Sequence, residues 1–140
     1  MLLALYSKSV KYAISAMACL ALIYGKELKK VKDIARECRI PNQYLAKLIS
    51  DLRQAHLVKA VRGPTGGVKL SRNPSDIKIF EVISAVNEPP INDMECLLGL
   101  GCCGDDDECP FHETWAEIRN KIHLDIEKKT LADFVKMKNK

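Results

Sequence analysis

Two short amphipathic segments, residues 31–38 and 41–53, are joined by a turn of only two residues, Arg39 and Ile40. In both, apolar residues recur three and four positions apart, the spacing of one face of a helix. Pro41 suits the first position of the second helix, where a missing N–H costs nothing. Two short helices joined so tightly predict a helix-turn-helix. The apolar positions are Val31, Ile34, Ala35 and Cys38, followed by Leu45, Leu48, Ile49 and Leu52.

The other face of the second segment offers small or hydrogen-bonding side chains and one cation. Such a face fits the major groove of DNA, where amide and ammonium groups can contact base edges. A helix hairpin with an ordinary solvated face would show the same pattern, so this segment alone leaves both interpretations open. The candidate contacts are Pro41, Asn42, Gln43, Tyr44 and Lys47, with Ala46 and Ser50 on the same face.

A β-hairpin is predicted directly after these helices. Residues 57–62 alternate like a strand, Gly63-Pro64-Thr65-Gly66-Gly67 reads as a turn, and residues 68–70 return. A hairpin in this position makes a winged helix. Glycines allow close approach to a phosphate, and Arg62 can enter a narrow minor groove. The candidate wing contacts are Lys59, Arg62, Gly63, Thr65, Gly66 and Gly67, with Lys69 and Arg72 as further phosphate contacts.

The expected fold is mainly α-helical with one small hairpin. A first helix over residues 10–21 precedes the helix-turn-helix, and one more core helix begins near Ile79 and stops at Pro89-Pro90. Ser7 or Ser9 can cap the first helix, and Thr130 with Asp133 resembles the cap of a short last helix. We divide the chain into a winged-helix domain (1–90), a cysteine-rich loop (91–109) and a C-terminal part (110–140).

The C-terminal part is expected to contain a long helix beginning near Pro110. Little chain remains to cover its apolar stripe, and helix-turn-helix proteins commonly bind two half-sites of DNA. We therefore expect a homodimer through this helix. The stripe consists of Trp115, Ile118, Ile122 and Ile126.

Charge is distributed unevenly along the 140 residues. Residues 1–90 carry 15 Lys/Arg against 7 Asp/Glu, whereas residues 91–114 carry no Lys/Arg and 7 Asp/Glu. The basic N-terminal part suits an anionic partner such as double-stranded DNA. An apolar run over residues 12–24 is too short for a membrane span and lacks a cleavage site after it. We expect a cytoplasmic protein without a membrane partner.

Four of the six cysteines fall within 14 residues of the acidic segment, and a histidine follows them. A secreted disulfide scaffold would spread its cysteines more widely, and tight zinc-type pairs are missing. Thiolates on a glycine-containing loop can instead hold an iron–sulfur cluster. His112 could equally be a helix-start residue, and Cys103 a ligand, a replacement for Cys102 or a free thiol. The candidate ligands are Cys96, Cys102, Cys103, Cys109 and His112.

Together these segments resemble the Rrf2 family of bacterial winged-helix regulators, which includes iron–sulfur cluster assembly regulators and nitric-oxide-sensing repressors. The resemblance covers nearly the whole chain. It implies a dimer joined through the long helix, a recognition helix over residues 41–53, and a wing arginine at Arg62. It also implies cluster ligands at Cys96, Cys102 or Cys103, and Cys109, with His112 as the fourth. The resemblance is carried by residues 7–14, 31–35, 40–45 and 61–67 and by the spaced cysteines.

Two departures limit what the resemblance implies. Cluster-assembly regulators have an acidic residue where this chain has Ala46, so their operator preference does not carry over. The nitric-oxide sensor uses a carboxylate near the N-terminus, where this chain has Ser7, Lys8 and Ser9. This second departure disfavours the exact ligand set of the nitric-oxide sensor and leaves the cluster type open. Of the two types, 2Fe–2S is favoured over 4Fe–4S, and the fourth ligand is not fixed.

The function expected is a transcription regulator, most simply a repressor, that senses redox state, iron or nitric oxide through the cluster. One alternative is a winged-helix sensor that uses thiols or zinc without iron. Another is a small iron–sulfur electron-transfer protein. An enzyme is not expected, nor a small-molecule substrate, because we find no nucleophile–base pair or phosphate loop.

Overall fold

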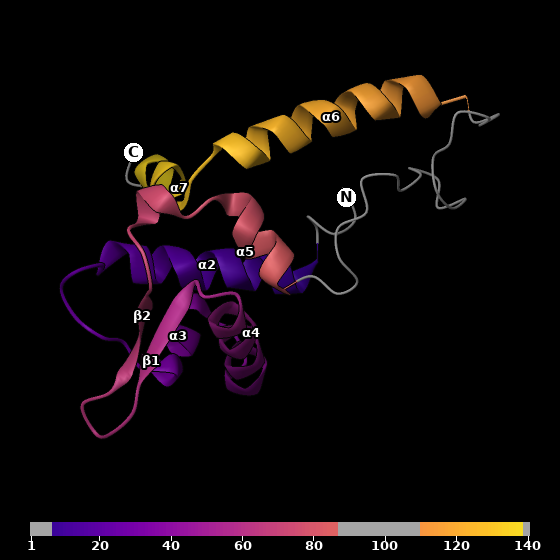
Figure 1. Cartoon of the computed structure of the whole chain (residues 1–140). Helices are drawn as coiled ribbons and strands as arrows, with labels where there is room; N and C mark the ends of the chain where they lie inside the picture. The colour runs from indigo at the N-terminus through magenta and orange to yellow at the C-terminus, as the bar shows by residue number, and fades with distance from the viewer. Residues whose placement is uncertain (1–6, 87–109, 139–140) are drawn as a thin grey trace.

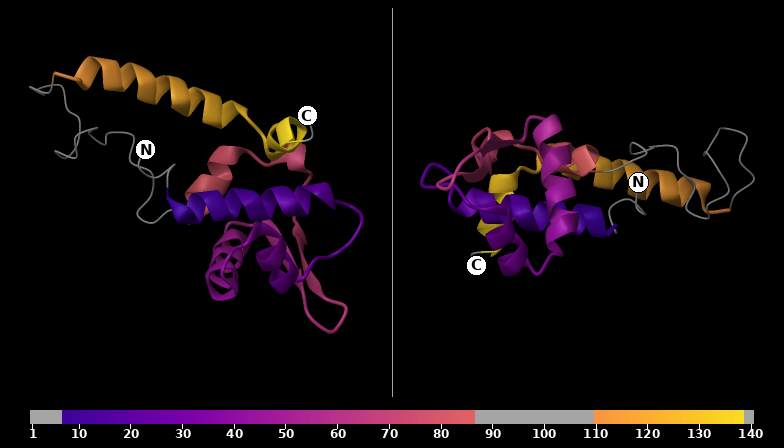
Figure 2. Two further views of the ribbon diagram at one scale, coloured as in Figure 1. Left: turned by 180° about the vertical axis from the view of Figure 1, so that it is seen from behind. Right: turned by 90° about the horizontal axis from the view of Figure 1, so that it is seen from below.

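The computed structural model describes residues 7–86 and 110–138. Helix α2 (Lys8–Leu22) lies at its centre. Below it in Figure 1 are α3 (Val31–Cys38), α4 (Asn42–Gln54) and the strands β1 (Val58–Val61) and β2 (Gly67–Leu70). Above it are the 3-10 helix η1 (Pro74–Asp76), α5 (Ile79–Val86) and α7 (Leu131–Lys138). Helix α6 (His112–Lys128) extends away from this body, as both views of Figure 2 show. The fold is thus mainly helical with one hairpin, as predicted.

The core of the body forms around α2 because its apolar residues occupy several faces. Met17 and Leu20 are almost fully buried, and they belong to one cluster with Ile34 of α3, Leu45 of α4 and Ile83 of α5. Ser7 caps α2 by accepting a hydrogen bond from the Val10 N–H at 3.2 Å. The helix-turn-helix is therefore held against a central scaffold rather than standing alone.

The turn between α3 and α4 depends on two backbone conformations. Arg39 ends α3 with φ of 55°, in the left-handed region that closes many helices. Pro41 adopts an extended conformation and is the N-cap of α4, so the helix begins at Asn42. The sequence predicted Pro41 as the first residue of the helix itself, whereas in the structure it immediately precedes that first residue. The missing proline N–H is harmless at either position.

The hairpin is a two-stranded antiparallel sheet with Val58 opposite Leu70 and Lys59 opposite Lys69. Its inner face contributes Val58, Val68 and Leu70 to the core. A short extended segment adds to its edge, because Lys29 and Val68 exchange backbone hydrogen bonds of 3.1 and 2.8 Å. The hairpin is therefore attached to the connection between α2 and α3 as well as to α4.

Helix α7 belongs to the same body. Thr130 pairs with Lys78 in an isolated β-bridge, and Leu131 donates from its N–H to the Ile77 carbonyl at 2.8 Å. Leu131 is completely buried in the core. Helix α7 therefore packs with the body formed by residues 7–86, although it belongs to the C-terminal part of the chain that begins at residue 110.

Candidate nucleic-acid interface

The N-terminal half of α4 presents its polar side chains to solvent. Leu45, Leu48, Ile49 and Leu52 turn inward and are buried, whereas Asn42, Gln43 and Lys47 are exposed. The helical repeat therefore separates a core face from a polar face. Pro41 is exposed at the start of the helix. Helix α4 therefore offers solvent a polar face of amide and ammonium groups.

Tyr44 is positioned differently from its neighbours on α4. Its hydroxyl lies 2.6 Å from the Ser9 hydroxyl on α2, and its ring contacts Tyr12 edge-on at 5.4 Å between centroids. Tyr44 therefore links the recognition helix to the central helix. Sequence reasoning placed Tyr44 among the DNA contacts and missed Ser9 and Tyr12 as its partners, because this contact joins residues 35 positions apart.

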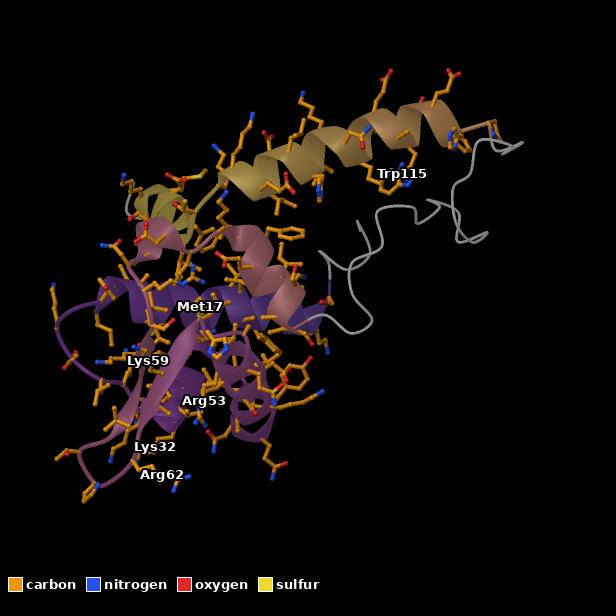
Figure 3. All side chains as sticks on the ribbon, in the orientation of Figure 1. Met17, Lys32, Arg53, Lys59, Arg62 and Trp115 are labelled. Atoms are coloured by element: carbon orange, nitrogen blue, oxygen red, sulfur yellow. The ribbon has the colours of Figure 1, made fainter. Side chains whose placement is uncertain are left out.

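Cationic side chains lie along the same lower part of the molecule. Figure 3 shows Arg62 near the free end of the hairpin, with Lys32 of α3 close to it in this view and Arg53 and Lys59 above them. All four are exposed. Lys32 and Arg53 were not among the predicted contacts, although each is a charged residue on the solvent face of an amphipathic helix. The region carries positive charge beyond the predicted set.

Arg72 was expected to contact phosphate, and in the structure its guanidinium forms a partly exposed ion pair with Glu81. Its guanidinium donates to a Glu81 carboxylate oxygen at 2.9 Å and to the Asp76 carbonyl at 3.0 Å. Burial alone would raise the pKa of Glu81, but the Lys78 N–H and the Arg72 guanidinium together bring it below its usual value. Arg72 thus ties the hairpin to the start of α5.

The wing glycines are required by the hairpin itself. A Cβ on Gly66 would lie 2.0 Å from the Val61 carbonyl oxygen, and one on Gly67 would lie 2.7 Å from the Lys29 carbonyl oxygen. Gly66 is buried, whereas Gly63 and Thr65 are exposed at the tip. The glycine pair lets the hairpin close and pair with the chain after α2, a reason that the sequence alone did not provide.

The predicted stripe on α6 is split by its surroundings. Trp115 is buried, Ile126 packs partly against the core, and Ile118 is 45% exposed. Phe80 of α5 contacts His123 of α6 edge-on at 5.6 Å. Exposed apolar side chains on and just before α6 include Phe111, Ile118 and Leu124. An apolar surface therefore remains on the helix that extends from the body.

The predicted cluster ligands fall mostly outside the described residues. Cys96, Cys102, Cys103 and Cys109 lie in residues 87–109, and only His112, the first residue of α6, is described. Within residues 7–86 and 110–138, no group of three or more His, Cys, Asp or Glu side chains is arranged to hold a metal ion. No described helix is long and apolar enough to cross a membrane.

Two further cysteines lie where α2 and α3 face each other, Cys19 on α2 and Cys38 at the end of α3. The Cys19 thiol donates to a Glu37 carboxylate oxygen at 3.4 Å, and Lys29 donates to the same oxygen at 2.5 Å. Burial and the Glu37 carboxylate raise the pKa of Cys19 to about 11. Cys19 is therefore a protonated thiol at neutral pH and a poor nucleophile. Cys38 and Cys19 both line a surface hollow between α2 and α3. The Cys38 thiol donates weakly to the Ser15 carbonyl at 3.7 Å.

A helix-turn-helix followed by a β-hairpin on a helical body defines a winged-helix protein, the class to which the structural relatives belong. The B. subtilis global cysteine regulator CymR superposes with a TM-score of 0.79 at 28% identity, covering 94% of this chain and 95% of that one. The T. potens IscR structure superposes with a TM-score of 0.72 at 32% identity, covering 93% and 85%.

The particular family follows from the sequence. Residues 6–137 match the family model of Rrf2, described as an iron-dependent transcriptional regulator, and the chain belongs to this family. The transcriptional regulator IscR of Escherichia coli O1:K1 is 35% identical over 125 residues, which cover 89% of this chain and 76% of that protein. The protein is therefore a transcriptional regulator and not an enzyme.

Proposed function

We propose that the protein is a repressor that binds an operator with α4 in the major groove and the hairpin beside it. Asn42, Gln43 and Lys47 would contact base edges and phosphates, and Arg62 would enter the minor groove. Pro41, Gly63 and Thr65 would lie at the edges of this contact. The proposal is supported by the exposure of these residues, by the position of α4 and the hairpin on the same side of α2 (Figure 1), and by family membership.

Selection of duplexes from a random library, followed by titration of the selected duplex, tests this proposal. Arg62→Ala should weaken specific binding at physiological salt, whereas Lys136→Ala at an exposed position on α7 should not. Unchanged affinity of Arg62→Ala would remove the role assigned to Arg62.

We further propose that two copies associate through α6, so that two recognition helices reach two half-sites. The exposed apolar residues Ile118 and Leu124 support this assignment, because a single copy leaves them in solvent. Trp115, Ile122 and Ile126 would shape the same helix surface. Sedimentation of the wild type and of Ile118→Glu tests the interface: a shift to monomer is expected.

The sensor is proposed to be an iron–sulfur cluster, with 2Fe–2S favoured. Cys96, Cys109 and either Cys102 or Cys103 would hold it with thiolates, and His112 would add a neutral imidazole. This donor set suits iron–sulfur chemistry, and His112 stands at a helix N-terminus, which favours negative charge. When bound, the cluster would supply a redox-sensitive or iron-sensitive centre. Anaerobic absorption spectra with iron and sulfide analysis, on wild type and Cys109→Ala, test this assignment.

A thiol-based sensor is the second candidate. It is supported by the likeness to CymR, whose structure is described as that of a global cysteine regulator. Cys19 is unsuited to that role because its thiol stays protonated, so the loop cysteines or Cys38 would have to carry it. An iron-free, colourless protein whose DNA binding responds to thiol oxidants would favour this candidate.

A further inference from the structure

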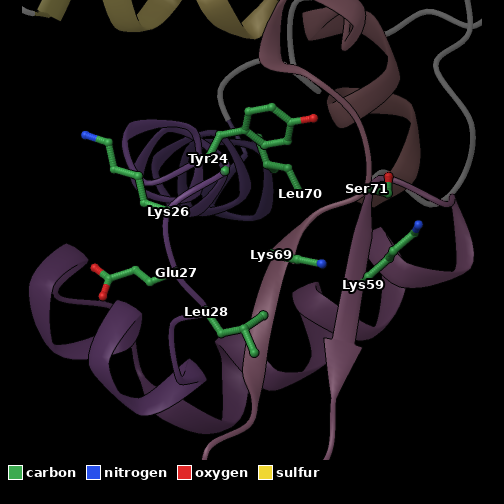
Figure 4. Close-up of a pocket in the computed structure, with 9 residues that line it drawn as sticks. Tyr24, Lys26, Glu27, Leu28, Lys59, Lys69, Leu70 and Ser71 are labelled. Atoms are coloured by element: carbon green, nitrogen blue, oxygen red, sulfur yellow. The ribbon is translucent and has the colours of Figure 1, made fainter.

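A hollow of about 420 Å³ lies between the chain after α2 and the hairpin (Figure 4), and none of its lining residues belongs to α4. Lysines and hydroxyl-bearing residues account for most of its polar lining. They include Tyr24, Lys26, Lys59, Lys69 and Ser71, and the single carboxylate among the lining residues is that of Glu27.

Lys59 and Lys69 are directly opposite each other on β1 and β2. Both are exposed, whereas the residues on either side of Lys69, Val68 and Leu70, are buried. Because side chains alternate across a strand, the two lysines share the outer face of the hairpin. Like charges placed opposite each other destabilise a strand pair. An anion between them would offset this repulsion.

No carboxylate in the described part of the chain forms an ion pair with either lysine. In Figure 4 the Glu27 carboxylate points away from them, and so does the Lys26 ammonium. The Tyr24 hydroxyl points toward the same side as the two lysine ammonium groups. Two cations and one hydroxyl group of the lining therefore point to the side that the Glu27 carboxylate does not face.

Positive charge continues on the other side of Lys59. This residue also lines an adjoining hollow of about 570 Å³, together with Ser50, Arg53 and Gln54. None of its lining residues is acidic. Lys59 therefore stands between two surfaces that both favour anions.

We propose that Lys59 and Lys69, with the Tyr24 hydroxyl, form a phosphate-binding site on the outer face of the hairpin. The site is distinct from the polar face of α4 and from the wing tip. Its phosphate can come from the DNA backbone flanking the operator, a source that rests on the proposed function, or from a free phosphate-bearing small molecule. Both sources present anionic phosphate oxygens, one negative charge on a DNA phosphodiester and up to two on a free phosphate, which lysine binds as a point charge.

The test compares the full-length wild type with Lys59→Gln/Lys69→Gln. A matched control, Lys129→Gln/Lys136→Gln, removes the same charge from exposed positions after α6 and on α7, away from the hairpin and from the proposed dimer face. The first measurement is an NMR titration of isotope-labelled protein with inorganic phosphate at low ionic strength. Saturable shifts at residues 59 and 69 are expected in wild type and control. They should be lost in the hairpin variant, and a melting temperature at or above that of wild type would show that this variant folds.

The second measurement is the salt dependence of binding to the selected duplex, with short and with extended flanks. If DNA supplies the phosphate, the hairpin variant lowers the slope of log K against log salt by about 0.9 per lost contact, on the extended duplex alone. If a free phosphate is the ligand, the NMR shifts are lost but the slopes are unchanged. Wild-type behaviour of the hairpin variant in both measurements would overturn the site and leave the lysines as a solvated strand edge.

The two measurements also separate this proposal from the proposed function. Failure of the wild type to bind any duplex would refute the operator-binding function, yet the phosphate titration would still test the site. Normal duplex binding by wild type would refute the site alone if wild type shows no phosphate shifts at residues 59 and 69 and the variant leaves the slope unchanged.

Discussion

The Tyr44 hydroxyl on α4 lies 2.6 Å from the Ser9 hydroxyl on α2, which fixes one side of the recognition helix to the central helix. The edge-on contact of Tyr44 with Tyr12 adds a second attachment at the same point. Tyr44 thus orients the residues that flank it on α4.

Tyr44→Phe removes the hydrogen bond and keeps the ring. We expect a loss of about 0.5–1.5 kcal/mol in the free energy of unfolding, the usual net value of one hydrogen bond. Urea unfolding of Tyr44→Phe, Ser9→Ala and the double variant measures the coupling. Additive effects of the two single substitutions would show that the pair is not energetically linked.

Gly66→Ala places a methyl group against the Val61 carbonyl, which the hairpin cannot accommodate without opening. Gly25→Ala is the matched control, because Gly25 has φ of 78° but open space around its Cβ position. The control should cost about 1–2 kcal/mol for left-handed backbone alone. Gly66→Ala should cost more and should also weaken DNA binding. Equal costs in thermal or urea unfolding would contradict the steric argument.

Thr130 and Asp133 form a reciprocal cap at the start of α7. The Thr130 hydroxyl accepts from the Asp133 N–H at 3.2 Å, and Asp133 accepts from the Thr130 N–H at 3.0 Å. Thr130→Ala should lower the free energy of unfolding by about 1 kcal/mol. Thr130→Ser, which keeps the hydroxyl, should recover most of it in the same urea titration.

The same cap predicts a pH dependence. Hydrogen bonds from the Thr130 N–H and hydroxyl lower the pKa of Asp133 below 3.8. A carboxyl whose pKa is lower in the folded than in the unfolded state stabilises the folded state when the pH is above its unfolded-state pKa. This contribution is lost as the pH falls through its folded-state pKa. Asp133→Asn should therefore be less stable than wild type at pH 6, and the difference should shrink below about pH 4. A difference that stays constant down to pH 2 would exclude this linkage.

Cys19 should react slowly with iodoacetamide at neutral pH. Burial, followed by the Glu37 carboxylate, raises its pKa to about 11 against 9.0 for an ordinary thiol. Peptide-resolved mass spectrometry over a pH series should show the Cys19 rate still rising above pH 9. A plateau near pH 9 would mean that the thiol is not held in its protonated form.

Local periodicity predicted the elements of this fold well. The apolar spacing of residues 31–52 and the Gly-Pro-Thr-Gly-Gly turn each indicated a structure that short-range geometry determines, and the fold confirmed both. The cap formed by Thr130 and Asp133 was likewise found from sequence. These features depend on residues only a few positions apart.

The contacts that the sequence did not reveal join distant segments. The partners of Tyr44 lie on another helix, Gly67 must leave room for Lys29, and Arg72 is occupied by Glu81. No periodicity encodes such pairings, because they depend on how completed helices and strands pack. The DNA contacts, cluster ligands and dimer residues remain predictions for the same reason: each requires a partner molecule or residues outside the described ranges.

The β-bridge between Lys78 and Thr130 and the burial of Leu131 give α6 a fixed end. Its last turn leads directly into the core beneath α7, while its first turn is the end next to the cysteine-rich segment. A displacement of the His112 end would thus rotate α6 about its attachment at residues 129–131. A fragment that ends at residue 90 would lose both α6 and Leu131, the core residue that anchors it.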